Sequence, residues 1–564
     1  MKRAQPAPTI PSIPPTHGSR VEHIFPTLTP AQVSRVAAQG RHRLVERGEI
    51  LVDVGAQRQP FFVVTAGYLE VVQRSGSREE LLAVYRPGEF TGEASMLSGR
   101  RGLVRIRAKA PSEVIEVERE RVLALIQTDS DLGDVLLRAF LLRRVELIVQ
   151  GLGDVVVAGS NHCASTLRIK EFLTRNGHPY AFVDLDKEED VQGLLDGFQV
   201  TLAEVPVVVC RGETVLKNPN NKEVADCLGF NDAVDQTKAR DMVVIGAGPS
   251  GLAAALCGAS EGLDVLVLEM SSPGGQASAS SKIENYLGFP TGISGQDLAA
   301  RAYSQAQKFG AEVLVAKGAN RLRCGGTRYV VDVEDGPSIP ARTIVIATGA
   351  RYRKPSVASL PRFEGQGVYY GATFIESQVC RGEEVIVVGG GNAAGQAAVF
   401  LAESARRVTV VVRSSGLGEN MSRYLIRRIE QNPAIEVKTR AEIESLEGDF
   451  HLERVGVRDN RTGVIESRDV RHVFLMMGAV PSTAWLEGCI ALDPHGFIRT
   501  GPELTADDLT ASDWTLGRAP HLLETSRPGI FAVGDVRAGN VKRVASAVGE
   551  GSIAIAFVHR VLQE

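Results

Sequence analysis

The sequence predicts a multidomain α/β protein that contains a β-roll, a small α/β domain and a C-terminal region with two strand–turn–helix–strand units. The chain has 564 residues, several times the length of an average domain. Its hydrophobic pattern changes from short strands with glycine breaks to alternating strands and helices. Many of its 58 glycines follow apolar runs, where the backbone turns tightly or approaches a ligand closely. These observations argue against a single compact core.

Composition and charge exclude several classes of protein. With 44% hydrophobic and 23% charged residues, the chain is neither collagen-like, nor a coiled coil, nor largely disordered. The formal net charge of -4 shows no excess of positive charge, so neither nucleic acid nor an anionic membrane is expected as a partner. No apolar run reaches about 18 residues, so we expect no membrane-spanning segment.

The cysteines and the N-terminus predict a cytoplasmic location. The seven cysteines are scattered and contain no Cys-x-x-Cys pair, which excludes a disulfide scaffold and a zinc ribbon, and we expect no metal site. Residues 1–20 lack the apolar stretch of a signal peptide and are expected to form a proline-rich disordered arm. Four cysteines are expected to be buried or incidental: Cys257, Cys324, Cys380 and Cys489.

Residues 21–150 are predicted to form a β-roll closed by an amphipathic helix over 134–150. The stretch FTGEASMLSGRRGLV resembles the phosphate-binding cassette of cyclic-nucleotide-binding domains. The resemblance implies that Gly92 and Glu93 approach the phosphate and the ribose hydroxyl, and that Arg101 pairs with the phosphate. Because the residues after this arginine depart from the family pattern, two alternatives stay open. The roll either binds a cyclic nucleotide or retains only a packing or dimerisation role.

Residues 151–235 alternate strand, helix, strand, helix, strand, and resemble the thioredoxin and glutaredoxin fold. The resemblance places Cys163 at the nucleophilic position, Thr166 at the resolving position and Pro206 at the cis-proline. A cysteine at a helix N-terminus has its thiolate favoured by the helix dipole, so Cys163 is our candidate catalytic residue. The alternative is a docking domain in which Cys163 is an inert small hydrophobe.

The strongest signal is DMVVIGAGPSGLAAALCGASEGLDVLVLE, which predicts a dinucleotide-binding unit. Gly246 allows the tight turn, Gly248 lets backbone amides approach a pyrophosphate, and Gly251 lets the helix pack on the strand. Glu269 ends the second strand, where a carboxylate accepts hydrogen bonds from ribose hydroxyls.

A second unit follows in GEEVIVVGGGNAAGQAAVFLAESARRVTVVVR. Gly389, Gly391 and Ala394 repeat the spacing between a strand and a helix. Two units in tandem predict two dinucleotides. The acidic position of the second unit is replaced by the stretch that ends in Arg413, and a cation there suits a 2′-phosphate.

Residues 240–564 resemble low-molecular-weight thioredoxin reductases in GGQ, IENYLGFP, ATGA, MGAVPST and GIFAVGDV. The resemblance implies an FAD-binding domain over 240–353 and 470–564 and an NAD(P)H-binding domain over 354–469. It also implies that Asp535 holds the ribityl chain of FAD. The residues expected to bind the cofactors are Gly246, Gly248, Ser250, Gly251, Glu269, Gly275, Gln276, Asn285, Thr348, Gly349, Asp535, Val544, Ala545, Gly389, Gly391, Asn392, Ala394 and Arg413.

Two departures from this family bear on function. The catalytic Cys-Ala-Thr-Cys is replaced by Gly-Ala-Thr-Phe over residues 371–374, so no disulfide there can relay electrons from the flavin. Of the residues with which the family binds the 2′-phosphate of NADPH, the sequence keeps Arg413. The expected preference for NADPH over NADH therefore depends on this one arginine. The expected function is hydride transfer from NAD(P)H to FAD and on to a disulfide or protein acceptor, through Cys163 or to a ferredoxin. The rival is a redox or nucleotide sensor with little turnover, and a homodimer is expected in either case.

Overall fold

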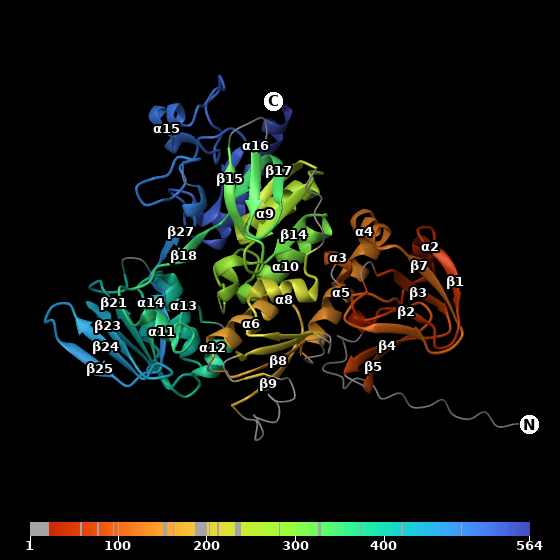
Figure 1. The fold of residues 1–564 in the computed structure, drawn as a ribbon, viewed down its shortest axis with the longest axis horizontal. Helices are drawn as coiled ribbons and strands as arrows, with labels where there is room; N and C mark the ends of the chain where they lie inside the picture. The colour runs from red at the N-terminus through yellow and green to blue at the C-terminus, as the bar shows by residue number, and fades with distance from the viewer. Residues whose placement is uncertain are drawn as a thin grey trace, which may run out of the picture. The chain divides into compact units, whose positions relative to one another are not determined.

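The computed structural model of the chain divides into two compact units, which are described separately (Figure 1). The first unit comprises essentially the N-terminal 155 residues, and the second comprises most of the remainder. The structure describes residues 22–564 except 57–58, 76–77, 94, 100, 150–154, 162, 187–199, 202–203, 211–213, 232–237, 281, 325–328, 373, 419–420 and 487. The predicted arm and the predicted helix over 191–198 lie outside the described residues.

The first unit is the predicted β-roll, built from two antiparallel sheets with strand orders β1-β7-β3 and β2-β6-β4-β5. The strands are β1 (Arg41–Val45), β2 (Ile50–Val52), β3 (Phe61–Ala66), β4 (Leu69–Ser75), β5 (Arg78–Tyr85), β6 (Arg105–Ala108) and β7 (Ser112–Val117). The helices are α2 (Pro30–Ala37), α3 (Ser95–Ser98), α4 (Arg119–Thr128) and α5 (Ser130–Val149). Phe140 of α5 packs edge-on against Phe61 and Phe90, which closes the apolar side of the roll.

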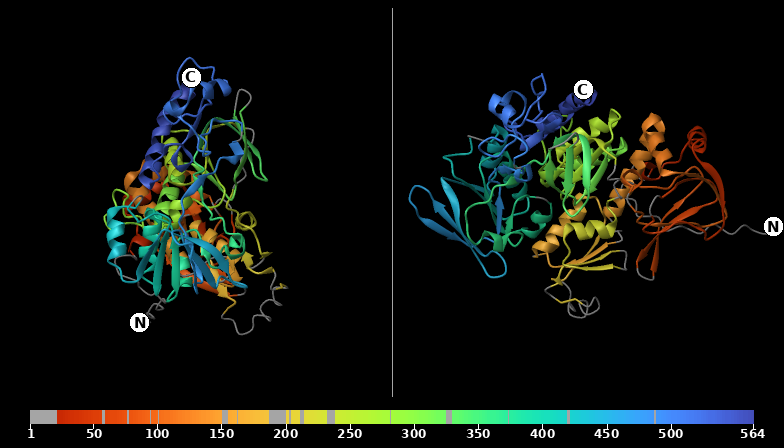
Figure 2. Two further views of the ribbon diagram at one scale, coloured as in Figure 1. Left: turned by 90° about the vertical axis from the view of Figure 1, so that its left-hand side faces the viewer. Right: turned by 45° about the horizontal axis from the view of Figure 1, so that its top comes forward.

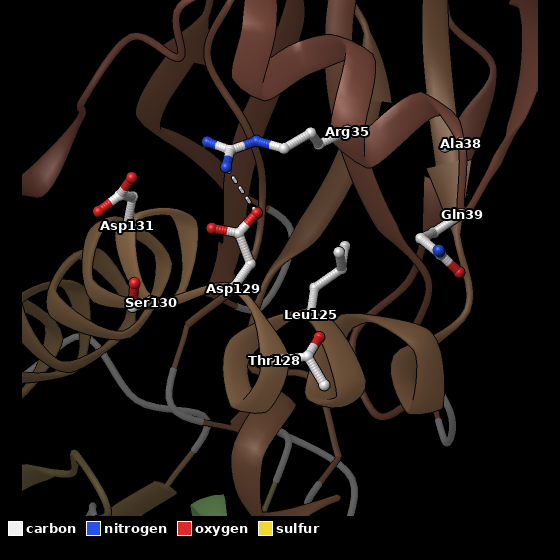
Figure 3. Close-up of a pocket in the computed structure, with 8 residues that line it drawn as sticks. All are labelled: Arg35, Ala38, Gln39, Leu125, Thr128, Asp129, Ser130 and Asp131. Carbon is white, nitrogen blue, oxygen red and sulfur yellow. Dashed lines mark ion pairs between the residues drawn. The ribbon is translucent and has the colours of Figure 1, made fainter.

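A pocket of about 530 Å³ lies where α2, α4 and α5 meet (Figure 3). Arg35 and Asp129 form an ion pair of 2.9 Å across it. None of the residues singled out from the sequence lines this pocket. It therefore belongs to the packing of the helices and not to the predicted site of the roll.

The small α/β domain has the predicted strand and helix order in its described residues. Its elements are β8 (Val155–Gly159), α6 (Ala164–Arg175), β9 (Ala181–Asp184), β10 (Val207–Cys210), β11 (Thr214–Lys217) and α8 (Asn221–Leu228). The strands form one sheet in the order β11-β10-β8-β9, with β10 and β11 antiparallel. The Val205–Pro206 peptide bond is cis, as the resemblance implied.

The first Rossmann domain, residues 240–352 and 477–564, contains a seven-stranded sheet with order β14-β13-β12-β17-β16-β15 and β28 beside β17. Its first segment comprises β12 (Arg240–Ile245), α9 (Pro249–Ser260), β13 (Val265–Glu269), η2 (Gly275–Ala279), α10 (Gly295–Lys308), β14 (Glu312–Val315), β15 (Ala319–Arg323), β16 (Tyr329–Val333), β17 (Ser338–Ile346) and β18 (Ala350–Tyr352). Its returning segment comprises β27 (Ala479–Pro481), η3 (Ala484–Leu486), η4 (Gly501–Glu503), α15 (Ala506–Ala511), β28 (Ile530–Ala532), η5 (Gly534–Val536) and α16 (Val544–Gln563).

The second Rossmann domain, residues 353–476, is inserted between these segments and has a parallel sheet with order β19-β26-β20-β21-β22. Its elements are α11 (Leu360–Phe363), β19 (Val368–Tyr369), α12 (Phe374–Val379), β20 (Glu384–Val388), α13 (Asn392–Leu401), β21 (Arg407–Val412), α14 (Arg423–Glu430), β22 (Ile435–Thr439), β23 (Ala441–Glu447), β24 (Arg454–Asp459), β25 (Ile465–Arg468) and β26 (His472–Leu475). Figure 2 shows β23, β24 and β25 as a separate sheet beside this one.

The boundary expected at residue 470 shifts in the structure. Strand β26 pairs with β19 and β20, so it completes the sheet of the second Rossmann domain. The chain returns to the first Rossmann domain at β27, which pairs antiparallel with β18. These two short strands are the connection between the domains. Sequence motifs alone placed the boundary too early because the apolar strand β26 carries no motif of its own.

Among the described residues, α16 is the one helix with the length and apolar composition to cross a membrane. Its Gly551, Ala554 and Ile555 are buried, and Gly551 lies directly against α9 of the same domain. A core helix of this kind passes the same composition test as a membrane span. The cytoplasmic location expected from the sequence stays a prediction.

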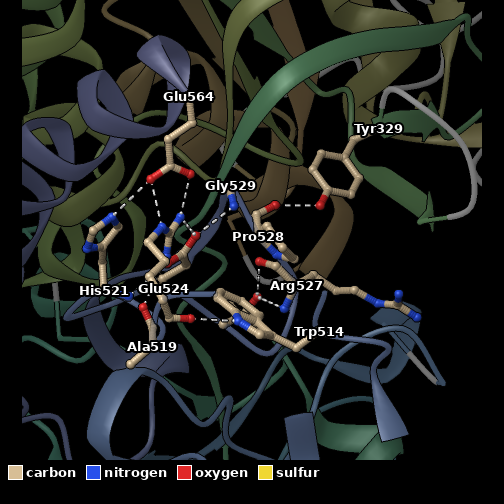
Figure 4. A network of polar contacts seen from close by, with 11 residues as sticks. Tyr329, Trp514, Ala519, His521, Glu524, Arg527, Pro528, Gly529 and Glu564 are labelled. Atoms are coloured by element: carbon tan, nitrogen blue, oxygen red, sulfur yellow. Dashed lines mark hydrogen bonds and ion pairs between the residues drawn. The ribbon is translucent and has the colours of Figure 1, made fainter. Parts of the chain in front are cut away.

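The buried carboxylate of Glu524 forms hydrogen bonds that fix the segment just before β28 (Figure 4). The side chain of Glu524 is fully buried and accepts hydrogen bonds from the backbone N–H of Gly529 (2.8 Å) and from Arg518 Nη1 (2.7 Å). Arg518 also donates to Glu564 at the end of α16, and this hydrogen bond lowers the pKa of that carboxyl below its usual value. The network therefore ties α16 to the segment that leads to η5.

Cys324 and Cys489 form a disulfide within the first Rossmann domain. The expectation that these two cysteines are incidental was wrong. They are 165 positions apart, and only the fold brings them together. The other five cysteines form no disulfide, and Cys380 is buried as expected.

Candidate functional site

The glycine turn after β12 has the geometry predicted for a dinucleotide cradle. Gly246 has φ 103°, a left-handed conformation that side chains avoid. A Cβ on Gly251 would lie 1.9 Å from the backbone oxygen of Gly246, so the helix can approach the strand only without a side chain there. A Cβ on Gly248, by contrast, would meet no atom within 4 Å. Gly248 therefore faces the open space where a pyrophosphate would approach the start of α9.

Glu269 ends β13 at the position predicted, but both of its oxygens already accept backbone hydrogen bonds. Oε2 accepts from Ala247 N at 2.7 Å, and Oε1 accepts from Ser271 N at 2.8 Å. Burial raises the pKa of Glu269, and these hydrogen bonds oppose the rise. The carboxylate thus fixes the glycine turn. Next to it, the buried hydroxyl of Ser272 has no hydrogen-bond partner among the described residues, so this position is open to a ligand hydroxyl.

Asp535 lies on η5, directly after the buried strand β28. Burial raises the pKa of its carboxyl, and nearby Lys542 opposes the rise. No hydrogen bond or ion pair joins its carboxylate to another described residue, which suits an acceptor of ligand hydroxyls. The side-chain oxygen and nitrogen of Asn540 are also buried without a partner among the residues the structure describes. We missed Asn540 and Ser272 because neither belongs to a motif.

The other expected flavin-lining residues surround the same cradle. Gln276 of η2 donates to the backbone oxygen of Ala350, and Asn285 is exposed. Thr348 Oγ1 donates to Ser482 O at 3.0 Å, which joins the turn after β17 to the returning segment. Helix α16 begins at Val544, and its N-cap residue provides no side-chain cap, so its first N–H groups are available to an acceptor. These residues fit the chemistry of a flavin dinucleotide, with donors, acceptors and an open glycine backbone.

The second glycine turn repeats this arrangement in the second Rossmann domain. A Cβ on Gly389 would lie 2.2 Å from Met476 O, whereas one on Gly391 would meet nothing within 4 Å. Ala394 is fully buried where the helix packs on the sheet. Asn392 Oδ1 accepts from Ser422 N at 2.8 Å and so ties the start of α13 to the loop before α14. The turn is therefore shaped for a second dinucleotide.

Two arginines lie at adjacent ends of β21 and β22. In the sheet, Val412 pairs with Thr439, so the residues that follow them, Arg413 and Arg440, are neighbours. Arg440 N donates to Ser414 O at 2.9 Å. Both arginines are exposed, and neither forms an ion pair with a described residue. Sequence reasoning found Arg413 but missed Arg440, because the pairing of β22 with β21 was not predicted.

The segment that replaces the family's thiol pair lies against the flavin-side helix η2. Ala372 is buried and forms a β-bridge with Ser280, and Gly371 lies close to Ala279. Cys380, on the same side of the domain, is buried, and its burial raises the pKa of the thiol to about 12. A thiol with so high a pKa is not a nucleophile at neutral pH. The second Rossmann domain therefore offers no reactive thiol among its described residues.

Cys163 is the N-cap residue of α6 and is partly exposed. Its neighbour Ala164 lies against Gly365, and Leu167 belongs to the apolar core that also contains Ala372. The hydroxyl of Thr166 is fully buried beside Gly159 and has no hydrogen-bond partner among the described residues. The N-terminus of α6 thus lies on the side of the second Rossmann domain that holds the thiol-free segment. His162, which precedes Cys163 in the sequence, lies outside the described residues.

The roll brings its predicted residues together around a buried carboxylate. Both oxygens of Glu93 are buried and accept no hydrogen bond from a described residue. The nearest cation is Arg144 of α5, whose Nη1 lies 3.4 Å from Glu93 Oε2. Arg101 Nε is also buried without a partner in the described part of the chain, and Gly92 O accepts from Arg143. These unused donors and acceptors fit a ligand with hydroxyl and phosphate groups. Arg144 belongs to no motif, so its place on an amphipathic helix did not identify it as part of this site.

Comparisons with known proteins match the chain to two families. The family described as "Pyridine nucleotide-disulphide oxidoreductase" matches residues 240–551, and the "Cyclic nucleotide-binding domain" matches residues 42–129. The chain is 31% identical over 322 residues to the thioredoxin reductase of Mycoplasmopsis pulmonis. This alignment covers 57% of this chain and 97% of the relative. It is also 31% identical over 334 residues to the thioredoxin reductase of Bacillus subtilis, covering 59% and 97%.

A solved structure gives the same result for the fold. The thioredoxin reductase of Lactococcus lactis matches with a TM-score of 0.51 and 27% identity, over 58% of this chain and 100% of that one. The match to the family covers more than half of the chain and coincides with the two glycine cradles. The chain therefore belongs to the pyridine nucleotide-disulphide oxidoreductase family, in which it is a thioredoxin-reductase-like oxidoreductase that carries an N-terminal cyclic-nucleotide-binding domain.

Proposed function

We propose that the first Rossmann domain binds FAD and the second binds NAD(P)H, and that the chain passes reducing equivalents from the nicotinamide to a disulfide-containing acceptor. When bound, the flavin accepts a hydride from the reduced nicotinamide and supplies the redox chemistry. The chain binds and orients the two cofactors. The observations that carry this proposal are the open space at Gly248 and, in the same domain, the buried side-chain polar atoms of Ser272 and Asn540, which have no hydrogen-bond partner among the described residues.

We propose NADPH as the preferred dinucleotide. Arg413 and Arg440 are exposed neighbours at the end of the sheet where the adenosine ribose of a dinucleotide lies. Two guanidinium groups that form no ion pair with a described residue can both pair with a 2′-phosphate, whereas the free hydroxyls of NADH give them no charge to pair with.

The acceptor must reach the flavin without the usual thiol pair, because residues 371–374 hold none. We propose that Cys163 is the thiol that engages it. The thiolate of Cys163 would attack the acceptor disulfide, form a mixed disulfide and expel one thiol; two electrons from the bound cofactors and two protons would then cleave the mixed disulfide into the second acceptor thiol and the Cys163 thiol. The support is its place at the start of α6, on the side of the second Rossmann domain that holds Ala372. A ferredoxin as direct acceptor is the alternative in which Cys163 has no role.

A second function is favoured by the roll, where we propose that Glu93 and Arg101 bind a cyclic nucleotide. Its phosphate would pair with Arg101, and its ribose hydroxyl would donate to Glu93. The observation that favours this function is the burial of both groups without hydrogen-bond partners among the described residues, since such groups cost free energy unless a ligand satisfies them.

We further propose that the chain forms a homodimer through the first Rossmann domain. A largely apolar cavity of about 330 Å³ lies between α9, α10 and α16, and Tyr286 and Phe289 line it. Leu287, between these two aromatic residues, is 94% exposed. An apolar surface of this kind is typical of an interface with a second protein surface.

The purified protein is expected to be yellow, and NADPH is expected to bleach it faster than NADH under anaerobic conditions. Arg413→Gln and Arg440→Gln should each weaken NADPH binding about 10-fold, since each removes one charge-assisted hydrogen bond, and should leave the response to NADH unchanged. Stopped-flow absorbance of the flavin band measures both. Gly248→Ala should fold normally but take up less FAD. A colourless protein that cannot be loaded with FAD would contradict the function.

Cys163→Ser is expected to lower NADPH-dependent reduction of oxidised thioredoxin at least 100-fold, because serine forms no mixed disulfide. The rate at which NADPH bleaches the flavin should stay the same. Cys257→Ser, which removes another partly exposed thiol, is the matched control and should keep wild-type turnover. If Cys163→Ser turns over at the wild-type rate with thioredoxin or with ferredoxin, the role of Cys163 is wrong.

Calorimetric titration with cyclic AMP is expected to give a dissociation constant near the micromolar range. Arg101→Gln and Glu93→Gln should each weaken binding at least 10-fold, since each leaves the partner group on the ligand unpaired. Arg35→Gln, in the separate pocket of Figure 3, is the control and should bind as the wild type does. If neither cyclic AMP nor cyclic GMP at millimolar concentration produces heat of binding, the roll does not bind a cyclic nucleotide and has only a packing role.

Sedimentation velocity is expected to show a dimer at micromolar concentration. Leu287→Asp should weaken dimerisation about 10-fold or more, because it places a charge in the apolar surface, and should not disturb the fold at so exposed a position. Leu44→Asp, on the roll and 81% exposed, is the control. A wild-type monomer at all concentrations would contradict the dimer.

A further inference from the structure

The disulfide between Cys324 and Cys489 joins two parts of the chain that the second Rossmann domain separates. Cys324 follows β15, the edge strand of the large sheet, and Cys489 follows η3 of the returning segment. Between them lie β18, the whole second Rossmann domain and β27. The bond therefore closes a loop of 165 positions around that domain while both of its ends stay in the first Rossmann domain.

The surroundings of the two sulfurs show what the bond secures. Both cysteines are partly buried against the same apolar core, beside Leu486 and Ile490. Arg527 Nε donates to Cys489 O at 3.2 Å, and Tyr329 donates to Pro528 O, so the same region also holds the chain that leads into β28. Asp535 follows β28 directly. The bond thus fastens the returning segment that carries the proposed flavin-binding residues.

We propose that Cys324 and Cys489 form a reversible thiol–disulfide site, oxidised by low-molecular-weight disulfides, that fastens the returning segment of the first Rossmann domain. The two thiols react with one small disulfide: one thiolate attacks it and expels a thiol, and the second thiolate attacks the mixed disulfide and expels another. The two cysteine sulfurs are oxidised, the small disulfide is reduced to two thiols, and the two protons end on those thiols. Both cysteines are only partly buried, so a small reagent can reach them.

The effect of the bond follows from its position. A covalent link across so long a loop restricts the unfolded chain and therefore favours the folded state. In the reduced protein, only the apolar contacts around Leu486 and Ile490 and the hydrogen bonds of the region hold the returning segment to β15. The connection at β18 and β27 contains neither cysteine, so the bond lies outside it. The site regulates the stability of the first Rossmann domain.

The experiment uses the full chain equilibrated with oxidised or reduced glutathione. After alkylation of free thiols and proteolysis, mass spectrometry is expected to find a Cys324–Cys489 linked peptide in the oxidised sample and two alkylated peptides in the reduced one. Thermal unfolding followed by circular dichroism should show a midpoint about 5–10 °C lower for the reduced protein. Absence of the linked peptide, or equal midpoints for the two forms, would overturn the proposal.

Variants separate this bond from the other thiols. Cys324→Ser, Cys489→Ser and the double variant should all unfold at the midpoint of the reduced wild type and should not respond to glutathione. Cys257→Ser, a free and partly exposed cysteine of the same domain, should keep the full response. An unchanged glutathione response in Cys324→Ser, Cys489→Ser or the double variant would also overturn the proposal. Failure to take up FAD would contradict the proposed function but would leave the linked peptide and the shift of the midpoint unaffected.

Discussion

The site depends on a close approach of backbones around the start of α9, which glycine alone permits. A Cβ on Gly251 would lie 1.9 Å from Gly246 O, and a Cβ on Gly551 of α16 would lie 2.2 Å from Ser250 O. A Cβ on Gly534 would lie 2.4 Å from Ser250 Oγ. Three segments far apart in the sequence therefore meet at one turn of one helix. Asp535 directly follows Gly534 in the sequence, and Gly551 belongs to α16. These two contacts therefore position Asp535 and α16, so packing sets the geometry of the cradle without a ligand.

Much of this arrangement could be predicted because its cause is local. The spacing of Gly246, Gly248 and Gly251 after an apolar strand predicts the turn, and in the structure Gly246 has a left-handed conformation and Gly251 allows the helix to approach the strand. What could not be predicted depends on contacts between distant segments. The Cys324–Cys489 bond, the pairing of β26 with β20 and the neighbourhood of Arg413 and Arg440 all arise from strand order. Local periodicity carries no information about which strands become neighbours.

The loss of the thiol pair changes what the second Rossmann domain does. In this chain Ala372 bridges Ser280 beside η2, so the backbone of the segment keeps its place although its chemistry is gone. Cys380 does not replace it, because burial raises the pKa of the thiol to about 12 and leaves almost no thiolate at neutral pH. The remaining contribution of the domain is to hold and present a dinucleotide. The site of disulfide chemistry must then lie in another part of the chain or on the acceptor.

In the roll, the buried side chain of Arg143 fixes the backbone of the proposed ligand site. Arg143 is buried with its guanidinium 4.7 Å from the ring centre of Phe90 and 5.1 Å from that of Tyr85, and burial lowers its pKa. It donates to Gly92 O at 2.8 Å and to Ile24 O at 2.9 Å. A buried cation needs such acceptors, because without them its desolvation would not be offset. The backbone beside Glu93 is therefore fixed by Arg143, and the buried polar atoms of Glu93 and Arg101 have no hydrogen-bond partner among the described residues, as the proposed nucleotide site requires.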